Sequence, residues 1–166
     1  EQINYELTGN EILAKLIMLS KGLQKKVNLP FGLFFKNGKY SVQKNIVNKD
    51  EKPLLKFKSF TQGLKAVSFI KTQKQFSEIS EFKKVIDLKN RNEILLSTGR
   101  TLGEKSFLII EKGKLTAYGF YEYYTQIDQA KKRNQLKISV TKVSPDLINE
   151  IQIGILKGDF EIRPLN

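Results

Sequence analysis

The sequence contains no histidine, no cysteine and no tryptophan among its 166 residues. Without cysteine or histidine the chain cannot build a zinc finger, a cysteine–histidine or serine–histidine–aspartate nucleophile, or the usual ligation of haem and iron–sulfur clusters. It also cannot form a disulfide, so a reducing compartment is the natural setting and we expect a cytoplasmic protein. These absences exclude the commonest catalytic and metal-binding centres before any motif is considered.

Long apolar segments are absent as well. The longest are Ile12–Leu19, which Lys15 interrupts, and Phe107–Ile110. Both are much shorter than the roughly 20 apolar residues that a membrane-spanning helix needs. No targeting signal is recognisable near the N-terminus, and Glu1 stands where an initiator methionine is usual, which is typical of a segment from a longer protein. We therefore expect no membrane partner.

What the chain has in excess is positive charge. Lysine and arginine number 29 against 17 acidic residues, which gives a net charge of +12 and a pI near 9.7. Most of this excess lies in residues 1–102. Only four of the basic residues are arginines, and lysine suits contact with backbone phosphates better than bidentate recognition of bases. Composition alone supports nucleic-acid contact and simple solubility about equally.

Local signals in the first half predict three helices and a hairpin. Thr8 and Glu11 have the spacing of a capping box with Thr8 as N-cap, and Ser59 begins a second, weaker capping pattern. Asn37 and Gly38 both tolerate a positive φ and form the strongest hairpin signal in the chain. The elements predicted here are helices over about 10–26, 60–73 and 78–85, and strands over 31–36, 39–44 and 54–57.

The second half reads as a strand meander followed by a helix. Ser144 as N-cap and Pro145 at the first helical position predict the start of a helix that ends before Gly158. The polar segment 126–135 is predicted to be a loop. The predicted strands are 93–97, 106–111, 114–121, 136–143 and 160–163.

Together these elements predict an α+β fold of mostly antiparallel strands, with a hairpin, a three-stranded meander and three to four helices. The polar composition of residues 76–92 predicts a linker between a subdomain over 1–75 and another over 93–166. A single compact unit is the alternative.

Two patterns resemble chemical sites without completing one. The segment Thr98–Gly103 resembles a phosphate-binding loop, but it lacks the terminal Gly-Lys-Ser/Thr and precedes a strand instead of a helix. A metal-dependent nuclease needs carboxylates that converge on divalent cations, and no paired-carboxylate motif is present. The acidic candidates by type are Asp87, Glu93, Glu104, Glu111, Glu122 and Asp128.

A cluster of aromatic residues lies between Tyr118 and Tyr124. On a strand, alternate positions would place several rings on one face, where they could stack against single-stranded bases. Packing of one set of rings in the core is the alternative, and we favour it.

Two segments go beyond general pattern. The first is Asn4–Ala14, and the second comprises Ile94–Arg100, Glu104–Ser106, Leu108–Lys114 and Tyr118–Phe120. The first resembles the strand-to-helix passage of GIY-YIG nuclease domains of the UvrC type, above all those fused behind a DNA polymerase III epsilon-like exonuclease in Bacteroidetes-type bacterial proteins. The second is similar to the C-terminal segment of the same proteins.

The resemblance implies a remnant of a nuclease and not an active enzyme. It implies that the tyrosine pair and catalytic arginine of the family, and the exonuclease carboxylates, lie outside this chain. It also places the family's metal-binding glutamate at or near Met18, where no acidic residue stands. We therefore expect no catalytic residue, no metal site and no cofactor.

The resulting hypothesis is a non-catalytic accessory domain of a bacterial DNA exonuclease or DNA repair protein. It would bind DNA backbone weakly or position a catalytic domain, so the expected partners are DNA and a covalently linked exonuclease domain or a replication or repair protein. The candidate DNA contacts are Lys25, Lys26, Lys36, Lys39, Lys56, Lys58, Arg100, Lys131, Lys132 and Arg133. A protein-interaction module without DNA binding and a metal-dependent nuclease remain as alternatives.

Overall fold

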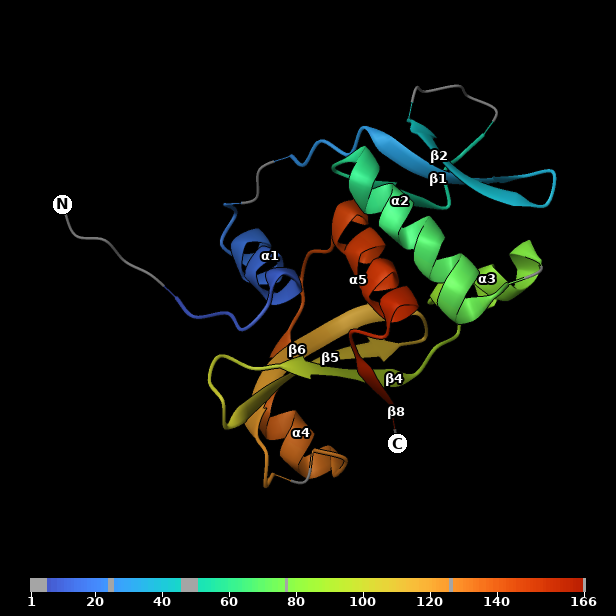
Figure 1. Ribbon diagram of the computed structural model, residues 1–166. Helices are drawn as coiled ribbons and strands as arrows, with labels where there is room; N and C mark the ends of the chain where they lie inside the picture. The colour runs from blue at the N-terminus through green and yellow to red at the C-terminus, as the bar shows by residue number, and fades with distance from the viewer. Residues whose placement is uncertain (1–5, 24–25, 46–50, 77, 126, 166) are drawn as a thin grey trace. The chain divides into compact units, whose positions relative to one another are not determined.

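A computed structural model describes residues 6–23, 26–45, 51–76, 78–125 and 127–165 (Figure 1). The chain divides into two compact units, each with its own antiparallel sheet. Unit 1 comprises residues 1–24, 88–148 and 158–166, and unit 2 comprises residues 25–87 and 149–157. The predicted α+β class with antiparallel strands is confirmed.

The sheet of unit 2 is built on the predicted hairpin. Strands β1 (Phe31–Lys36) and β2 (Lys39–Lys44) pair with each other, and β3 (Leu55–Phe57) pairs with the other side of β1. The order is therefore β2-β1-β3. Asn37 and Gly38 have φ values of 51° and 74°. Two consecutive left-handed residues form the turn that matches the twist of paired strands, so Lys36 pairs directly with Lys39.

Helices supply the rest of the core of unit 2. Helix α2 (Phe60–Phe69) begins as predicted, with the Ser59 hydroxyl accepting from the Gln62 amide, and a π-helical turn over Ile70–Lys74 continues it. Helix α3 (Ile79–Ile86) and residues 149–157 of α5 (Pro145–Lys157) complete the layer. In Figure 1, α2 and α5 lie on the same side of the hairpin. The core side chains include Leu33, Leu55, Ile70, Phe82 and Leu156.

Unit 1 contains a five-stranded sheet in the order β7-β6-β5-β4-β8. The predicted meander is present as β4, β5 and β6. The outer side of β4 pairs with β8, which follows α5 in the sequence. Helices α1 (Glu11–Ser20) and α4 (Ala130–Leu136) cover opposite faces of this sheet (Figure 1). The strands are β4 (Glu93–Thr98), β5 (Glu104–Glu111), β6 (Lys114–Glu122), β7 (Ile138–Ser139) and β8 (Glu161–Pro164).

Three local predictions for unit 1 are wrong. Asn10, not Thr8, caps α1, because its side-chain oxygen accepts from the Leu13 amide at 3.0 Å. The same helix ends at Ser20 instead of near residue 26, and Gly22 follows with a φ of 70°. Helix α4 occupies most of the segment predicted as a loop, and it leaves only two strand residues, in β7, within 136–143.

The units also differ from the predicted division at residues 75 and 93. Helix α1 belongs to unit 1, with the sheet that follows more than seventy residues later. The segment 76–92 contains α3, whose Phe82 and Ile86 are buried in the core of unit 2. Long-range packing thus groups segments that are far apart in the sequence.

A part-buried polar cluster attaches α1 to the sheet of unit 1. The Asn10 side-chain amide nitrogen lies 3.1 Å from Ser97 Oγ, 3.2 Å from Ser106 Oγ and 3.2 Å from the Thr98 carbonyl. The two serine hydroxyls lie 2.8 Å apart, and Ser106 Oγ also donates to the Thr98 carbonyl at 2.8 Å. One asparagine therefore both caps the helix and joins the hydrogen-bond network of the two serines.

A close approach of two glycines fixes the same junction. Gly9 has a φ of 79°, and a Cβ on it would lie 2.7 Å from the Gly99 carbonyl carbon. Any larger residue at position 9 would push the start of α1 away from the sheet.

Within the described residues, no helix is long and apolar enough to cross a membrane.

Replacing Asn10 by alanine tests the polar cluster. The substitution removes a helix cap and leaves the two serine hydroxyls with fewer partners, so we expect the free energy of unfolding to fall by about 2–4 kcal/mol. Urea denaturation measures this loss. Thr8→Ala is the matched control, with an expected change of less than about 0.5 kcal/mol. Equal losses in the two variants would show that Asn10 is not the cap.

Tyr40 offers a second test, in the core of unit 2. It is 7% exposed, its ring lies 4.7 Å from that of Phe35 and 5.5 Å from that of Phe82, and its hydroxyl has no hydrogen-bond partner within the described part of the chain. Burial, and then the nearby charge of Glu81, raise the pKa of this hydroxyl. Because an unsatisfied buried hydroxyl is costly, Tyr40→Phe should leave stability unchanged or raise it by about 1–2 kcal/mol. A loss greater than about 1 kcal/mol would mean that the hydroxyl has a partner.

Candidate functional site

The positive charge is concentrated in unit 2. Its segments contain 15 basic and 6 acidic residues, a net charge of +9, whereas those of unit 1 contain 14 and 11, a net charge of +3. A charge of this size attracts polyanions over about 8–10 Å at physiological salt. Unit 2 is therefore the better place to look for contacts with phosphates.

Three of the candidate lysines lie on one face of the unit 2 sheet. Side chains alternate along a strand, so burial of Leu33 and Leu55 in the core turns their neighbours toward the opposite side. Cross-strand pairing of Lys36 with Lys39 and of Gly32 with Lys56 keeps these residues on the same side. We call this side the open face. Its residues are Gly32, Phe34, Lys36, Lys39, Ser41, Gln43 and Lys56.

The lysines of the open face are exposed. In the part of the chain that the structure describes, Lys39 and Lys56 form no ion pair, and Lys36 has one exposed partner, Glu51, at 3.6 Å. An exposed pair of this kind contributes little and is screened by salt. All three ammonium groups are thus accessible to an anionic ligand.

The outer edge of β3 is held in place by a helix. The Asn149 side chain of α5 accepts from the Lys56 amide at 2.8 Å and donates to the Lys56 carbonyl at 2.9 Å. This pair of hydrogen bonds satisfies the unpaired edge of β3 and fixes the strand that presents the Lys56 side chain.

Two further candidate lysines of unit 2 lie outside the paired strands. Lys26 is exposed and precedes β1, and Lys58 follows β3, is exposed and contacts another group in the protein. Lys25 lies outside the described residues. In unit 1, Lys131 and Lys132 are exposed on the first turn of α4.

Arg133 has a structural role instead of the expected role in DNA contact. It is 5% exposed, and its guanidinium donates to the carbonyls of Ile127 and Asp128 at 3.3 and 3.1 Å. These bonds secure the segment that leads into α4, which explains why a helix forms where polarity predicted a loop. A buried guanidinium committed to backbone oxygens cannot contact phosphate, so the prediction for Arg133 is wrong.

The Arg100 side chain also has a partner within the protein, the carboxylate of Glu104. Arg100 lies in the loop that resembles a phosphate-binding motif. Its Nε and its backbone amide both donate to the Glu104 carboxylate at 2.9 Å, and its guanidinium lies 4.1 Å from the centre of the Phe120 ring. The carboxylate of Glu104 thus takes the position next to the arginine that a bound anion would need. The loop over 98–103 connects β4 to β5, and its one charged residue, Arg100, is neutralised by Glu104, the first residue of β5.

The acidic residues do not form a metal centre in the described part of the chain, where no group of three or more potential ligands is close enough to hold an ion. Glu93 pairs with Arg91 at 2.9 Å, and Asp128 pairs with Arg163 at 2.8 Å. Met18, at or near which the resemblance places the metal-binding glutamate of the family, is exposed on α1.

The tyrosine cluster is divided between core and surface. Tyr118 and Tyr121 are both buried, as the favoured core interpretation predicted. Tyr123 and Tyr124, beyond the end of β6, are 62% and 82% exposed. The Lys105 ammonium lies 5.4 Å from the Tyr123 ring, but the same lysine is paired with Glu161 at 2.8 Å.

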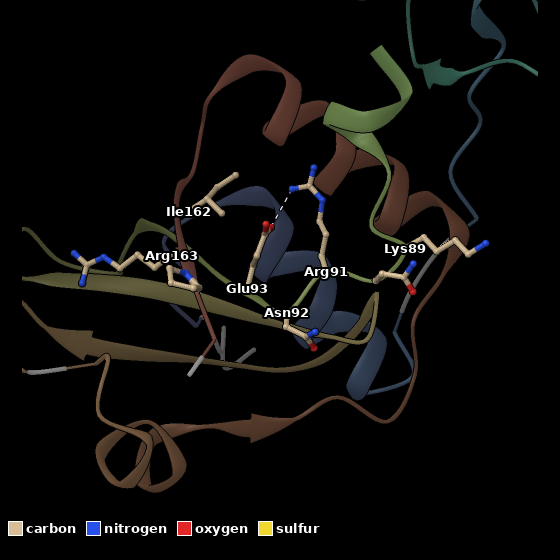
Figure 2. Close-up of a pocket in the computed structure, with 8 residues that line it drawn as sticks. Lys89, Arg91, Asn92, Glu93, Ile162 and Arg163 are labelled. Carbon is tan, nitrogen blue, oxygen red and sulfur yellow. Dashed lines mark hydrogen bonds and ion pairs between the residues drawn. The ribbon is translucent and has the colours of Figure 1, made fainter. Parts of the chain in front are cut away.

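A pocket of about 430 Å³ lies beside β4 and β8 in unit 1 (Figure 2). Its side chains do not converge on a ligand. Figure 2 shows Arg91 and Glu93 joined by their ion pair, whereas Lys89 and Arg163 point away in opposite directions. Arg163 is bound to Asp128 and Glu161. The pocket therefore lacks the convergent polar groups of a binding site.

Comparison with known proteins gives no relative: no family model, no curated protein and no solved structure matches the chain. The resemblance to GIY-YIG and epsilon-like exonuclease fusion proteins remains a prediction. The candidate site accordingly rests on geometry and charge.

Acid denaturation tests the role assigned to Glu104. Hydrogen bonding to Arg100 holds the pKa of this carboxyl below its ordinary value of 4.5. A lowered pKa in the folded protein means that the carboxylate stabilises the fold at neutral pH and that this contribution disappears as the pH falls through the lowered value. We therefore expect Glu104→Gln to lose less stability than the parent between neutral pH and the acid range in urea denaturation. Parallel pH profiles for the two proteins would contradict this assignment.

Proposed function

We propose that the chain binds the nucleic-acid backbone through the open face of unit 2 and serves as a non-catalytic accessory domain of a DNA-processing protein. The observation that carries the proposal is the presence of Lys36, Lys39 and Lys56 on one face of a rigid sheet in a unit with a net charge of +9. Lysine supplies a point charge on a long flexible stem, so it fits phosphates in varied positions without reading sequence. The expected binding is weak, salt-dependent and tolerant of sequence.

The accessory role is proposed from the resemblance, which implies that the catalytic residues of the family lie outside this chain. The lysines of the open face are exposed and available for phosphates. The resemblance supports a partner that performs the chemistry, namely a linked exonuclease domain or another replication or repair protein. The absence of cysteine fits a protein of the reducing cytoplasm.

A protein-interaction module is the second candidate, and one observation favours it. Phe60 and Leu64 lie one turn apart on α2 and are 45% and 46% exposed. Exposed apolar side chains on one helix face are typical of contact with another protein. Binding to a protein subunit, together with no nucleic-acid binding at low salt, would favour this function over the first.

Charge reversal on the open face tests the proposal. The variant Lys36→Glu/Lys39→Glu/Lys56→Glu should bind a fluorescent oligonucleotide at least about tenfold more weakly at low salt. The slope of log affinity against log salt should fall by about 2, because three phosphate contacts are lost. Fluorescence anisotropy at rising salt measures both quantities.

The matched control carries the same change in net charge on unit 1. Lys114→Glu/Lys137→Glu/Lys142→Glu alters three exposed lysines of unit 1 that are not among the candidate contacts. We expect this variant to lose clearly less affinity than the first and to keep most of the salt slope. Equal losses would show that only net charge matters, and no binding by the parent at low salt would contradict the proposed function.

A further inference from the structure

An aromatic side chain lies among the lysines of the open face. Phe34 is half-buried on β1, pairs across the strands with Ser41 and is two positions from Lys36. Its neighbours Leu33 and Phe35 pack into the core of unit 2 on the opposite side of the sheet. Phe34 is therefore excluded from that core by strand alternation.

The ring of Phe34 leans along its own strand over Gly32. A Cβ added to Gly32 would lie 2.9 Å from Cε2 and 3.2 Å from Cζ of Phe34, and 2.6 Å from Cβ of Pro53. Gly32 has no positive φ, so the reason for glycine here is the space that the two rings occupy. The half-buried ring of Phe34 therefore lies along the strand on the open face, in the same region as Pro53.

The groups around this ring are cationic or polar. Lys36 follows Phe34 on the same strand, Lys39 and Ser41 lie on β2, and Lys56 lies on β3 on the other side of Gly32. Among the described residues, the single acidic partner of these lysines is the exposed Glu51. The combination of an aromatic ring with flanking cations on a sheet suits a strand of unpaired nucleotides, because the phosphates meet the ammonium groups while a base stacks on the ring.

A duplex cannot use this ring, because its bases are already stacked and paired. It would contact the lysines alone. The exposed tyrosines of unit 1 are a weaker platform, since Lys105 beside Tyr123 is paired with Glu161, and Arg100 in the preceding loop is paired with Glu104. Unlike these tyrosines, the ring of the open face lies beside lysines whose charge is left for phosphates.

We propose that Phe34 stacks against a base and that the open face thereby prefers single-stranded nucleic acid to duplex. This inference rests on the proposed backbone binding and adds the class of ligand to it. Loss of the ring should weaken binding to a single strand by roughly 5- to 150-fold, the range typical of one base–aromatic stack. The salt slope should stay unchanged, since no phosphate contact is removed.

The experiment uses three variants of the full chain at position 34 and at an exposed tyrosine. Phe34→Ala removes the ring, and Phe34→Trp retains an aromatic ring and introduces the sole tryptophan of the chain. Tyr124→Trp places a tryptophan on the surface of unit 1 as the matched control. The probes are oligothymidylate, oligouridylate of the same length and a DNA duplex, with affinity measured by anisotropy and stacking by quenching of tryptophan fluorescence.

We expect Phe34→Ala to bind both single strands more weakly and the duplex as the parent does. The Phe34→Trp protein should keep its affinity and be quenched by the single strands but not by the duplex, and Tyr124→Trp should not be quenched. If Phe34→Ala is poorly folded, the quenching of Phe34→Trp decides the question alone. Comparison of the two single strands shows whether the ligand is DNA, RNA or both.

Two results would overturn the inference: equal affinity of Phe34→Ala and the parent for single strands, or a Phe34→Trp fluorescence that single strands do not change. Either result, together with weaker binding by the triple lysine variant, would leave the proposed backbone binding in place. Absence of binding by the parent to every probe would contradict both proposals, so the two failures are distinguishable.

Discussion

The register set by the Asn37-Gly38 turn determines both faces of the unit 2 sheet. The turn pairs Lys36 with Lys39, and alternation along β1 then sends Leu33 to the core and Phe34 to the open face. A slip of one residue would exchange the faces, exposing the core leucine and burying lysines. The cost of burying charge without a partner makes that alternative strongly unfavourable. The same register that stabilises the core therefore also groups the cations.

Unit 1 differs from unit 2 in that its arginines and Lys105 are bound to other groups of the protein. Its exposed and partly buried arginines are bound to carboxylates or carbonyls, as the pairs Arg100–Glu104 and Arg163–Asp128 illustrate. The ion pair of Lys105 with Glu161 joins β5 to the end of the chain. These contacts stabilise loops and strand ends, so the charges that take part in them are not available to a ligand. Unit 2 contains no arginine, and the lysines of its open face are exposed.

The sequence predicted local features well where the determinant lies within a few residues. The hairpin follows from Asn37 and Gly38, and the starts of two helices follow from Ser59 and Ser144, whose hydroxyls accept from amides three residues later. It did not predict α4, because that helix depends on Arg133 binding carbonyls from the preceding segment. The role of Asn10 was missed for a similar reason, since its partners lie nearly ninety residues away.

The candidate site shows the same limit. Composition identified the lysines as candidates. Only the strand register places three of them beside Phe34, and the hairpin signal at Asn37 and Gly38 predicted part of that register. Neutralisation of Arg100 by a residue four positions along could be suspected from spacing, whereas burial of Arg133 could not. Grouping of α1 with unit 1 required tertiary contacts, since no local pattern links residue 10 to residue 97.

We propose that the ligand contacts lie on the open face of unit 2. To locate them, the backbone amide resonances of the isotope-labelled chain are followed while an unlabelled single-stranded oligonucleotide is added. We expect the largest chemical-shift changes in β1, β2 and β3, centred on Phe34, with small changes in α4 and in the loop over 98–103. Changes concentrated in unit 1, or none in the three strands at low salt, would contradict it.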